Sequence, residues 1–303
     1  MNKDIKPLDT RKTVTVTTKN GLVTAERLAT LSLKARKLLY VIIAQSTREH
    51  TGFYTYTTTD VELSKILGVN LQDLYRDMTG VVDQLMAVSI RLEDDKKIRW
   101  RHLVDSGTEY DKEAHTLTIA LHEDMRDLIL GVEKGGHFAK PLLWDFLRMR
   151  SKYGLALWHY ISAEMKAGGQ GISVARQYDI DIDIDTLRKI SGTENKLKQI
   201  VNLRERVLDV AIADIERNCL AKVEYTPLKH GRKVTGFRLR VSNHLGYADP
   251  ESMTLRTRQR ARKAELVRLK STRALTQKED DELQALILEL DQMTMEDYTR
   301  GGV

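Results

Sequence analysis

The chain has one cysteine and four prolines in 303 residues, and no apolar run approaches the ~20 residues needed to cross a bilayer. A single cysteine can form no internal disulfide and supplies no cysteine-rich zinc motif, which is typical of a reducing compartment. The first ten residues, MNKDIKPLDT, lack the apolar core of a secretory signal. These absences favour a cytoplasmic protein without membrane contact, in which Cys219 fills the core.

Motifs for catalysis and for metal binding are also missing. None of the eight histidines stands two residues from another, which excludes the His-hydrophobic-His metal motif of a DNA-nicking initiator. The segment 131–138 (GVEKGGHF) lacks the lysine and the hydroxyl of a phosphate loop, and we interpret it as a linker. Asp181, Asp183 and Asp185 alternate as calcium ligands do, but no glutamate or loop glycine follows at EF-hand spacing. We expect no catalytic site, metal or cofactor.

Charge is nearly balanced overall but segregated near the end of the chain. There are 49 lysines and arginines against 43 aspartates and glutamates, so a surface for a polyanion must be local. Residues 256–273 hold eight basic side chains, whereas residues 279–297 hold eight acidic ones and no basic one. This pattern favours two helices folded back so that opposite charges meet. The alternative is a basic arm that adds to affinity for DNA, with the acidic segment restraining it or contacting other proteins.

Residues 195–215 predict a long helix with one apolar side and one donor-rich side. The side expected to be buried comprises Ile200, Leu203, Val207, Leu208, Ala211, Ile212 and Ile215. The other side holds Lys198, Gln199, Asn202 and Arg206. Such donors suit purine edges and phosphates in a DNA groove. The alternative is that this side of the helix is only a solvated surface.

The segment before this helix favours the DNA interpretation. Isoleucines and aspartates alternate over residues 178–185, which predicts a strand. Asp185 is expected to cap a short helix that Gly192 ends, and Asn195 to cap the long helix. Helix, glycine-containing turn and helix form the helix-turn-helix pattern.

The segment after the helix predicts a basic β-hairpin. Its strands are expected at 221–226 and 233–241, and its turn carries Lys229, Arg232 and Lys233. Cations this close repel one another unless phosphates neutralise them. A helix followed by such a hairpin is the DNA-binding part of a winged helix.

The same order of elements is expected once more upstream. Ser32 caps an apolar helix, a strand covers FYTYTTTD, and Asp60 caps a short helix that Gly68 ends. Asn70 then opens a second helix, with strands near 98–104 and 116–121 completing a small sheet. One face of that second helix is expected to be buried and comprises Leu71, Leu74, Tyr75, Met78, Val82 and Leu85. The two copies form a structural repeat without a fixed sequence period.

The first copy is expected to bind DNA less strongly than the second. Gln72, Arg76 and Thr79 share its exposed face, but Asp73 and Asp77 lie close to them. The following strands offer further cations, namely Lys96, Lys97, Arg99 and Arg101. We include Lys97 and Arg99 in the predicted DNA-binding set.

Four stretches together resemble the Rep initiators of iteron-containing plasmids, and they cover roughly residues 20 to 245. LSLKARKLLYVIIAQ resembles the first long helix of that family, and residues 54–90 resemble its first winged-helix domain. LRMRSKYGLALWHYISAEM is similar to the helix that opens the second domain. LRERVLDVAIADIE, with the later KHGRKV, is similar to that domain's recognition helix and wing.

The resemblance implies an α+β, mostly helical fold with two tandem winged-helix domains and a charged helical tail. We expect a flexible segment at 1–19, a first domain for dimerisation and DNA binding at 20–134, a main recognition domain at 135–248 and the tail at 249–303. Family members bind repeats in double-stranded origin DNA, help to open the origin, and recruit the host replication initiator and replicative helicase. As homodimers through the first domain they typically repress their own gene. The apolar series Leu22, Leu31, Leu38 and Leu39 is a candidate dimer surface, and burial of these leucines inside the first domain is the alternative. A transcriptional regulator without origin function and an origin-nicking enzyme are the alternatives.

Overall fold

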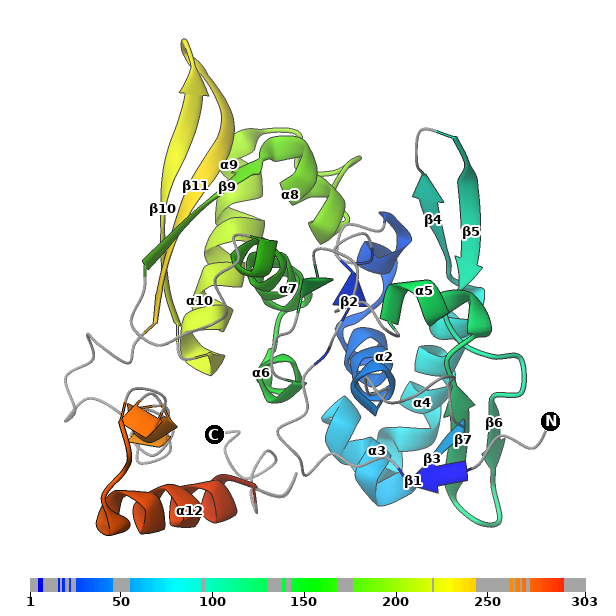
Figure 1. Cartoon of the computed structure of the whole chain (residues 1–303). Helices are drawn as coiled ribbons and strands as arrows, with labels where there is room; N and C mark the ends of the chain where they lie inside the picture. The colour runs from blue at the N-terminus through cyan, green and yellow to red at the C-terminus, as the bar shows by residue number, and fades with distance from the viewer. Residues whose placement is uncertain are drawn as a thin grey trace.

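The chain runs through two successive helix-and-sheet units and ends in a helical segment (Figure 1). The computed structural model describes residues 5–7, 16, 18–19, 22, 26–45, 55–93, 96–129, 138–139, 143–167, 177–219, 221–243, 262–263, 265–267, 269–270 and 273–291. Residues 131–137 of the predicted linker at 131–138, most of the segment 1–19 and the boundary at 248 lie outside the described residues, whereas Phe138 lies in a short strand.

The first unit combines several helices with a four-stranded sheet. Its helical elements are η1 (Glu26–Thr30), α2 (Leu33–Gln45), α3 (Asp60–Leu67), α4 (Leu71–Ala87), η2 (Glu123–Met125) and α5 (Arg126–Ile129). Its strands are β1 (Ile5–Pro7), β3 (Thr55–Thr59), β4 (Ser89–Glu93), β5 (Ile98–His102), β6 (Glu109–Asp111) and β7 (Thr116–Ala120). The sheet has the order β1-β3-β7-β6, with β1 parallel to β3 and the other neighbours antiparallel.

The start of α3 differs from the prediction. Thr59 caps it, because its hydroxyl accepts from the Glu62 amide while the Glu62 carboxylate accepts from the Thr59 amide. Asp60 is the first helical residue, and its carboxylate instead accepts from the Tyr110 hydroxyl at 2.9 Å. Gly68 ends the helix as predicted, with φ at 67°, a left-handed conformation that glycine adopts without steric cost.

The helix α2 lies in the middle of the core. Ser32 caps it as predicted and accepts a hydrogen bond from the Ala35 amide. The proposed dimer series is buried inside this single chain, with Leu22, Leu31, Leu38 and Leu39 at most 1% exposed. The series is therefore buried in the core of the chain, as the alternative interpretation predicts, and it is not available as a dimer surface.

The strands β4 and β5 form a separate hairpin. The sequence predicts that β5 and β7 belong to one sheet, but β5 pairs only with β4. The segments that follow β5 and β7 meet at an isolated antiparallel bridge between Val104 and Leu121, with backbone hydrogen bonds from Asp105 to Ala120 and from His122 to Leu103. The partner of β7 in a hairpin is β6, so β6 and β7 form the wing of the first unit and β4–β5 is an insertion.

The second unit repeats the arrangement with a three-stranded sheet of order β10-β11-β9. Its helical elements are α6 (Leu143–Arg148), α7 (Lys152–Ala167), α8 (Ile184–Ser191), α9 (Ile200–Leu203), the π-helical turn η4 (Arg204–Leu208) and α10 (Asp209–Asn218). Its strands are β9 (Gln177–Asp183), β10 (Ala221–His230) and β11 (Lys233–Asn243). In both units a strand and two helices precede a hairpin whose last strand pairs antiparallel with the first. The predicted fold class, two tandem winged-helix domains, is confirmed.

Aspartates that alternate along β9 hold arginines rather than calcium. Arg238 on β11 forms an ion pair with Asp181 (2.7 Å), and Arg240 forms one with Asp179 (3.0 Å), each directly across the strand pair. Asp183, two residues before the predicted Asp185, caps α8 by accepting from the Thr186 amide. The strand ends two residues before the alternation does, because Ile184 and Asp185 belong to α8.

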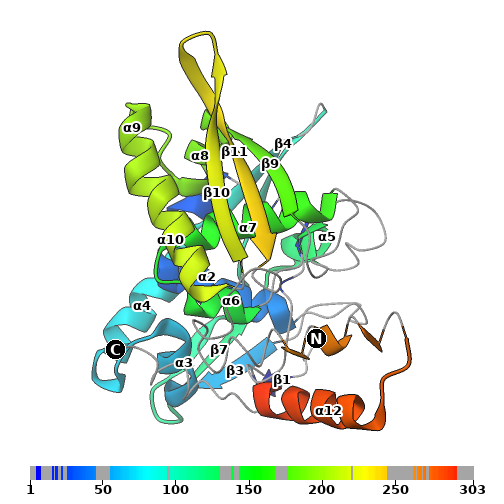
Figure 2. The ribbon, with the colours of Figure 1, turned by 90° about the vertical axis from the view of Figure 1, so that its left-hand side faces the viewer.

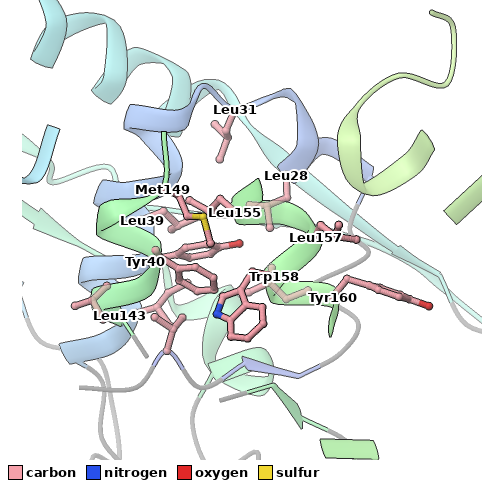
Figure 3. Close-up of a cluster of buried hydrophobic side chains, with 14 of the residues drawn as sticks. Leu28, Leu31, Leu39, Tyr40, Leu143, Met149, Leu155, Leu157, Trp158 and Tyr160 are labelled. Atoms are coloured by element: carbon pink, nitrogen blue, oxygen red, sulfur yellow. The ribbon is translucent and has the colours of Figure 1, made fainter. Parts of the chain in front are cut away.

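A buried histidine joins the two units. His159 of α7 has its Nδ1 2.8 Å from the Tyr40 hydroxyl of α2 and its Nε2 2.9 Å from Thr18 Oγ1. Thr18 belongs to β2 (Thr18–Lys19), which pairs with β8 (Phe138–Ala139). Burial lowers the pKa of His159 to about 3 and raises the pKa of Tyr40 to about 12, so both side chains are neutral. Figure 3 shows the apolar side chains around this contact, among them Leu143, Met149, Leu155 and Trp158.

The end of the chain forms the two facing helices that its charge pattern predicts. Residues 262–263, 265–267 and 269–270 are helical, and α12 (Gln277–Asp291) follows them. Arg262 pairs with Glu282 and Lys270 pairs with Asp280, both at 2.9 Å. Leu266 is buried against Leu283 and Leu286 of α12. Among the described residues no helix is long and apolar enough to span a membrane.

Candidate nucleic-acid interface

The helix-turn-helix of the second unit is held by one arginine. Arg188 of α8 donates four hydrogen bonds to backbone carbonyls in the turn, namely those of Thr193 (3.3 Å), Lys196 (2.7 Å), Leu197 (3.0 Å) and Lys198 (2.9 Å). Gly192 ends α8 with φ at 66°, and a Cβ there would lie 2.9 Å from the Ala29 carbonyl oxygen of the first unit. The turn is therefore fixed both by its own helix and by its neighbour.

The long helix begins four residues later than predicted. It starts at Ile200 with Gln199 as its N-cap, whereas the sequence predicts a start capped by Asn195. Leu197 has a positive φ of 50°, which breaks the right-handed helical path, and the carbonyls of Lys196, Leu197 and Lys198 accept from Arg188. Lys198 consequently lies in the turn before the helix, and its side chain is exposed.

Two of the predicted groove residues lie on the helix itself. Arg206 is exposed and falls in the π-helical turn, whereas Asn202 is half-buried and donates to Gln199 Oε1 at 3.2 Å. The predicted apolar side is buried, apart from Ile200, which is partly buried. A π-turn is frequent at functional sites, and here it shifts the helix face at the residue that we expect to reach DNA.

The wing of the second unit projects beyond its sheet (Figure 1). The strand β9 pairs with β11 only from Gly236 to Ser242, so residues 228–235 belong to a two-stranded ribbon. The strands extend to His230 and Lys233, and the turn is shorter than predicted. Lys229, Arg232 and Lys233 are exposed at the tip, and none makes an ion pair or hydrogen bond through its side chain with another described residue.

The recognition helix of the first unit is less cationic, as predicted. Gln72, Arg76 and Thr79 are exposed on α4. Arg76, however, pairs with Asp73 at 2.9 Å and lies 3.8 Å from Asp77. The hydroxyl of Thr79 donates to the backbone carbonyl of its own helix four residues earlier.

Two side chains that the sequence pattern places in the core lie at the surface of α4. Leu71 is 55% exposed and Tyr75 is 53% exposed. The buried side of α4 is formed by Leu74, Met78, Val81 and Leu85, and Val82 is partly buried. The apolar residues of α4 cover more of the helix surface than its neighbours bury. Packing against α2 and α3 therefore decides which of these residues are buried.

Lys97 and Arg99 lie on the inserted hairpin β4–β5 and not beside α4 in a wing. Lys97 is exposed and Arg99 is half-buried. Both side chains interact with other groups of the chain, and so do Lys96 and Arg101. The wing of the first unit instead presents Lys112, whose ammonium lies 5.5 Å from the centre of the Tyr75 ring. Sequence analysis missed Lys112 because it assigned the wing to the wrong strand pair.

The two recognition helices lie on one side of the molecule. In Figure 2, α9 and α4 both lie along the left-hand side, with the wing β10–β11 rising beside α9. No group of three or more histidine, cysteine or acidic side chains in the described parts of the chain is arranged to hold a metal ion. The site is thus a surface of cations and donors for a polyanion.

The fold and this surface define a tandem winged-helix DNA-binding protein. The family profile described as "Initiator Replication protein, WH1" matches residues 15–162, and that described as "Initiator Rep protein, WH2" matches residues 183–241. The chain therefore belongs to the Rep3 family of initiator replication proteins, which are DNA-binding proteins and not enzymes.

A solved relative has the same fold. The crystal structure of Pi initiator protein in complex with iteron DNA matches with a TM-score of 0.62 at 19% identity, covering 77% of this chain and 98% of that one. No curated protein matches the chain.

Proposed function

We propose that this plasmid replication initiator acts by binding iteron repeats in its origin sequence-specifically. The observation that carries the proposal is a set of exposed cations on the turn, helix and wing of the second unit: Lys198, Arg206, Lys229, Arg232 and Lys233. None of these side chains pairs with another described residue, whereas Arg238 and Arg240 on the adjacent sheet are held by aspartates. Unpaired cations at a recognition helix and a wing suit phosphates and base edges. The solved relative, whose title names iteron DNA as the ligand of Pi, supports the same ligand here.

The predicted site residues divide into three roles in this proposal. Asn202 and Arg206 contact base edges, while Lys198 and Gln199 approach the groove from the turn before the helix. The three wing cations contact phosphates. Gln72, Arg76 and Thr79 contact a second stretch of groove, and Lys97 and Arg99 contact phosphates farther along the duplex. The division into domains at 20–134 and 135–248 belongs to the same proposal.

The wider role includes partners that the DNA surface does not itself identify. We propose origin opening, recruitment of the host replication initiator and replicative helicase, and autorepression by a homodimer in the bacterial cytoplasm. An exposed apolar surface on the inserted hairpin of the first unit is suited to a homodimer, because Ile98 (44% exposed) and Trp100 (61% exposed) stand on the same face of β5.

Footprinting of the purified protein on DNA flanking its own gene tests the proposal. We expect protection of directly repeated sites. A plasmid that carries only those repeats and this gene should then replicate, whereas a transcriptional regulator of the same fold would bind without supporting replication. No protection of any repeated sequence would overturn the proposal. A nicked circle with covalently attached protein would identify an origin-nicking enzyme instead.

A further inference from the structure

One stripe on the exposed side of α4 is mainly apolar. Leu71, Tyr75 and Thr79 follow one another at four-residue spacing, which places them in one stripe on the helix. Leu71 and Tyr75 are more than half exposed, and the Thr79 hydroxyl is occupied by its own helix. The methyl group of Thr79 is therefore the part of this side chain that is left to contact a partner.

The aromatic member of the stripe is held in place. The Tyr75 ring lies 6.0 Å from the ring of Tyr110 on β6, and the Tyr110 hydroxyl is fixed by Asp60. Lys112 at the wing tip has its ammonium 5.5 Å from the centre of the Tyr75 ring and is itself exposed. An apolar stripe beside a wing cation matches the major groove, where bases present apolar groups next to phosphates.

Only one base carries an apolar group in the major groove, namely thymine with its C5 methyl. The remaining charge on this face is weak, because Arg76 is held by Asp73 and Asp77. Arg76 must therefore leave these aspartates before it can bind a guanine edge, whereas Arg206 of the second unit makes no such pair in the described parts of the chain.

We infer that the first recognition helix reads thymines, with Leu71 and Tyr75 contacting their methyl groups. The inference rests on the proposed function and adds the base chemistry that this half of the site recognises. The occupant follows from continuity with the proposed DNA surface, since α4 lies on the same side of the molecule as α9 (Figure 2). The two units then read different chemistry, with apolar contacts in one and charged donors in the other.

Duplexes in which deoxyuridine replaces thymidine test the inference, because uracil lacks only the methyl group and keeps its base pairing. The probe is the footprinted repeat, with thymidines replaced in one half at a time. We expect the full-length protein to bind about fourfold more weakly for each methyl group removed from the contact surface, as burial of one such group implies. The weakening should be confined to one half of the repeat.

Two variants assign the effect to the stripe. In Leu71→Ala and Tyr75→Ala the penalty for uracil should disappear, since the methyl group then has no side chain to contact. Leu71→Met should keep most of it. Met86→Ala changes an exposed apolar residue at the far end of α4 and should keep the full penalty.

The remaining outcomes distinguish failure of this inference from failure of the proposed function. Equal affinity for thymine and uracil duplexes, or a penalty that persists in both alanine variants, overturns the inference while leaving iteron binding intact. No binding to the thymine duplex at all would instead contradict the proposed function. A change in sedimentation of the alanine variants, with no change in the uracil penalty, would identify the stripe as a contact between copies of the chain and would also overturn it.

Discussion

The Arg188 guanidinium donates a hydrogen bond of 2.9 Å to the backbone carbonyl of Lys198, ten residues away. The same side chain binds three further carbonyls of the turn, so α8 fixes the path by which the chain enters the recognition helix. A planar fork with five donors makes these contacts together, which a lysine ammonium does not.

Arg188→Lys should therefore loosen the turn and weaken DNA binding. We expect affinity for the footprinted repeat to fall about tenfold and the free energy of unfolding to fall by about 1–3 kcal/mol, since hydrogen bonds to a charged group are removed. Titration of a labelled duplex and urea unfolding measure the two effects. Lys189→Ala, which removes an exposed neighbouring cation, is the control. Wild-type affinity in Arg188→Lys would show that the turn holds its shape without the fork.

Arg206→Ala should remove a specific contact. If Arg206 binds a base edge, specific binding weakens by about 1–3 kcal/mol and discrimination relaxes at one base pair. Binding of single-base variants of the repeat measures both. Arg217→Ala changes an exposed arginine near the other end of the same helical stretch and should bind as the wild type does. An unchanged base preference in Arg206→Ala would remove this residue from the proposed site.

The wing cations should contact phosphates and carry little sequence information. Neutralising Lys229, Arg232 and Lys233 together should weaken specific and non-specific binding about equally. The slope of log affinity against log salt should flatten by roughly 0.9 for each phosphate that is no longer neutralised. Titrations over a salt series measure this slope. A changed sequence preference with an unchanged slope would mean that the wing contacts bases.

The buried histidine should make the fold sensitive to acid. The pKa of His159 is near 3 in the folded chain and about 6.5 when unfolded, so the unfolded state binds the proton first as pH falls. The stability contribution is complete above about pH 6.5 and declines toward pH 3, by up to about 1.4 kcal/mol per unit. Urea unfolding at pH 7.5 and 5.0 measures the decline. His159→Phe should lower stability at pH 7.5 but reduce the pH difference, whereas His230→Gln in the exposed wing should keep it. A pH difference that persists in His159→Phe would assign it to other groups.

The first unit should set the oligomeric state through its inserted hairpin. We expect a chain ending near Asp249 to dimerise, and the full-length double variant Ile98→Lys/Trp100→Lys to be monomeric, because it places charge on the exposed apolar face. Analytical ultracentrifugation measures the oligomeric state of the truncated chain and of the double variant. Val61→Lys, at another exposed apolar position of the first unit, should remain dimeric. A monomeric tail-deleted chain would move the interface to the carboxy-terminal helices. Deleting the first unit is a poorer test, since it would expose the core around His159.

Local sequence determined much of this architecture. The buried side of the long helix, the glycine ends at Gly68 and Gly192, and the paired charges of the tail all follow from spacing and residue type. These features depend on neighbours within one element or on adjacent elements, so their pattern is visible in the chain itself. The order of elements was enough to predict two winged helices.

Tertiary structure decided what depends on distant partners. The helix starts at Ile200, and the carbonyls just before it accept hydrogen bonds from Arg188. The periodicity of residues 195–199 contains no signal of that contact. Lys97 lies outside the expected wing because β7 pairs with β6 and not with β5. The sequence of a short strand does not show which other strand it will pair with. Tyr75 is exposed because α2 and α3 occupy only one side of α4, and a helical pattern alone does not say which side its neighbours will cover.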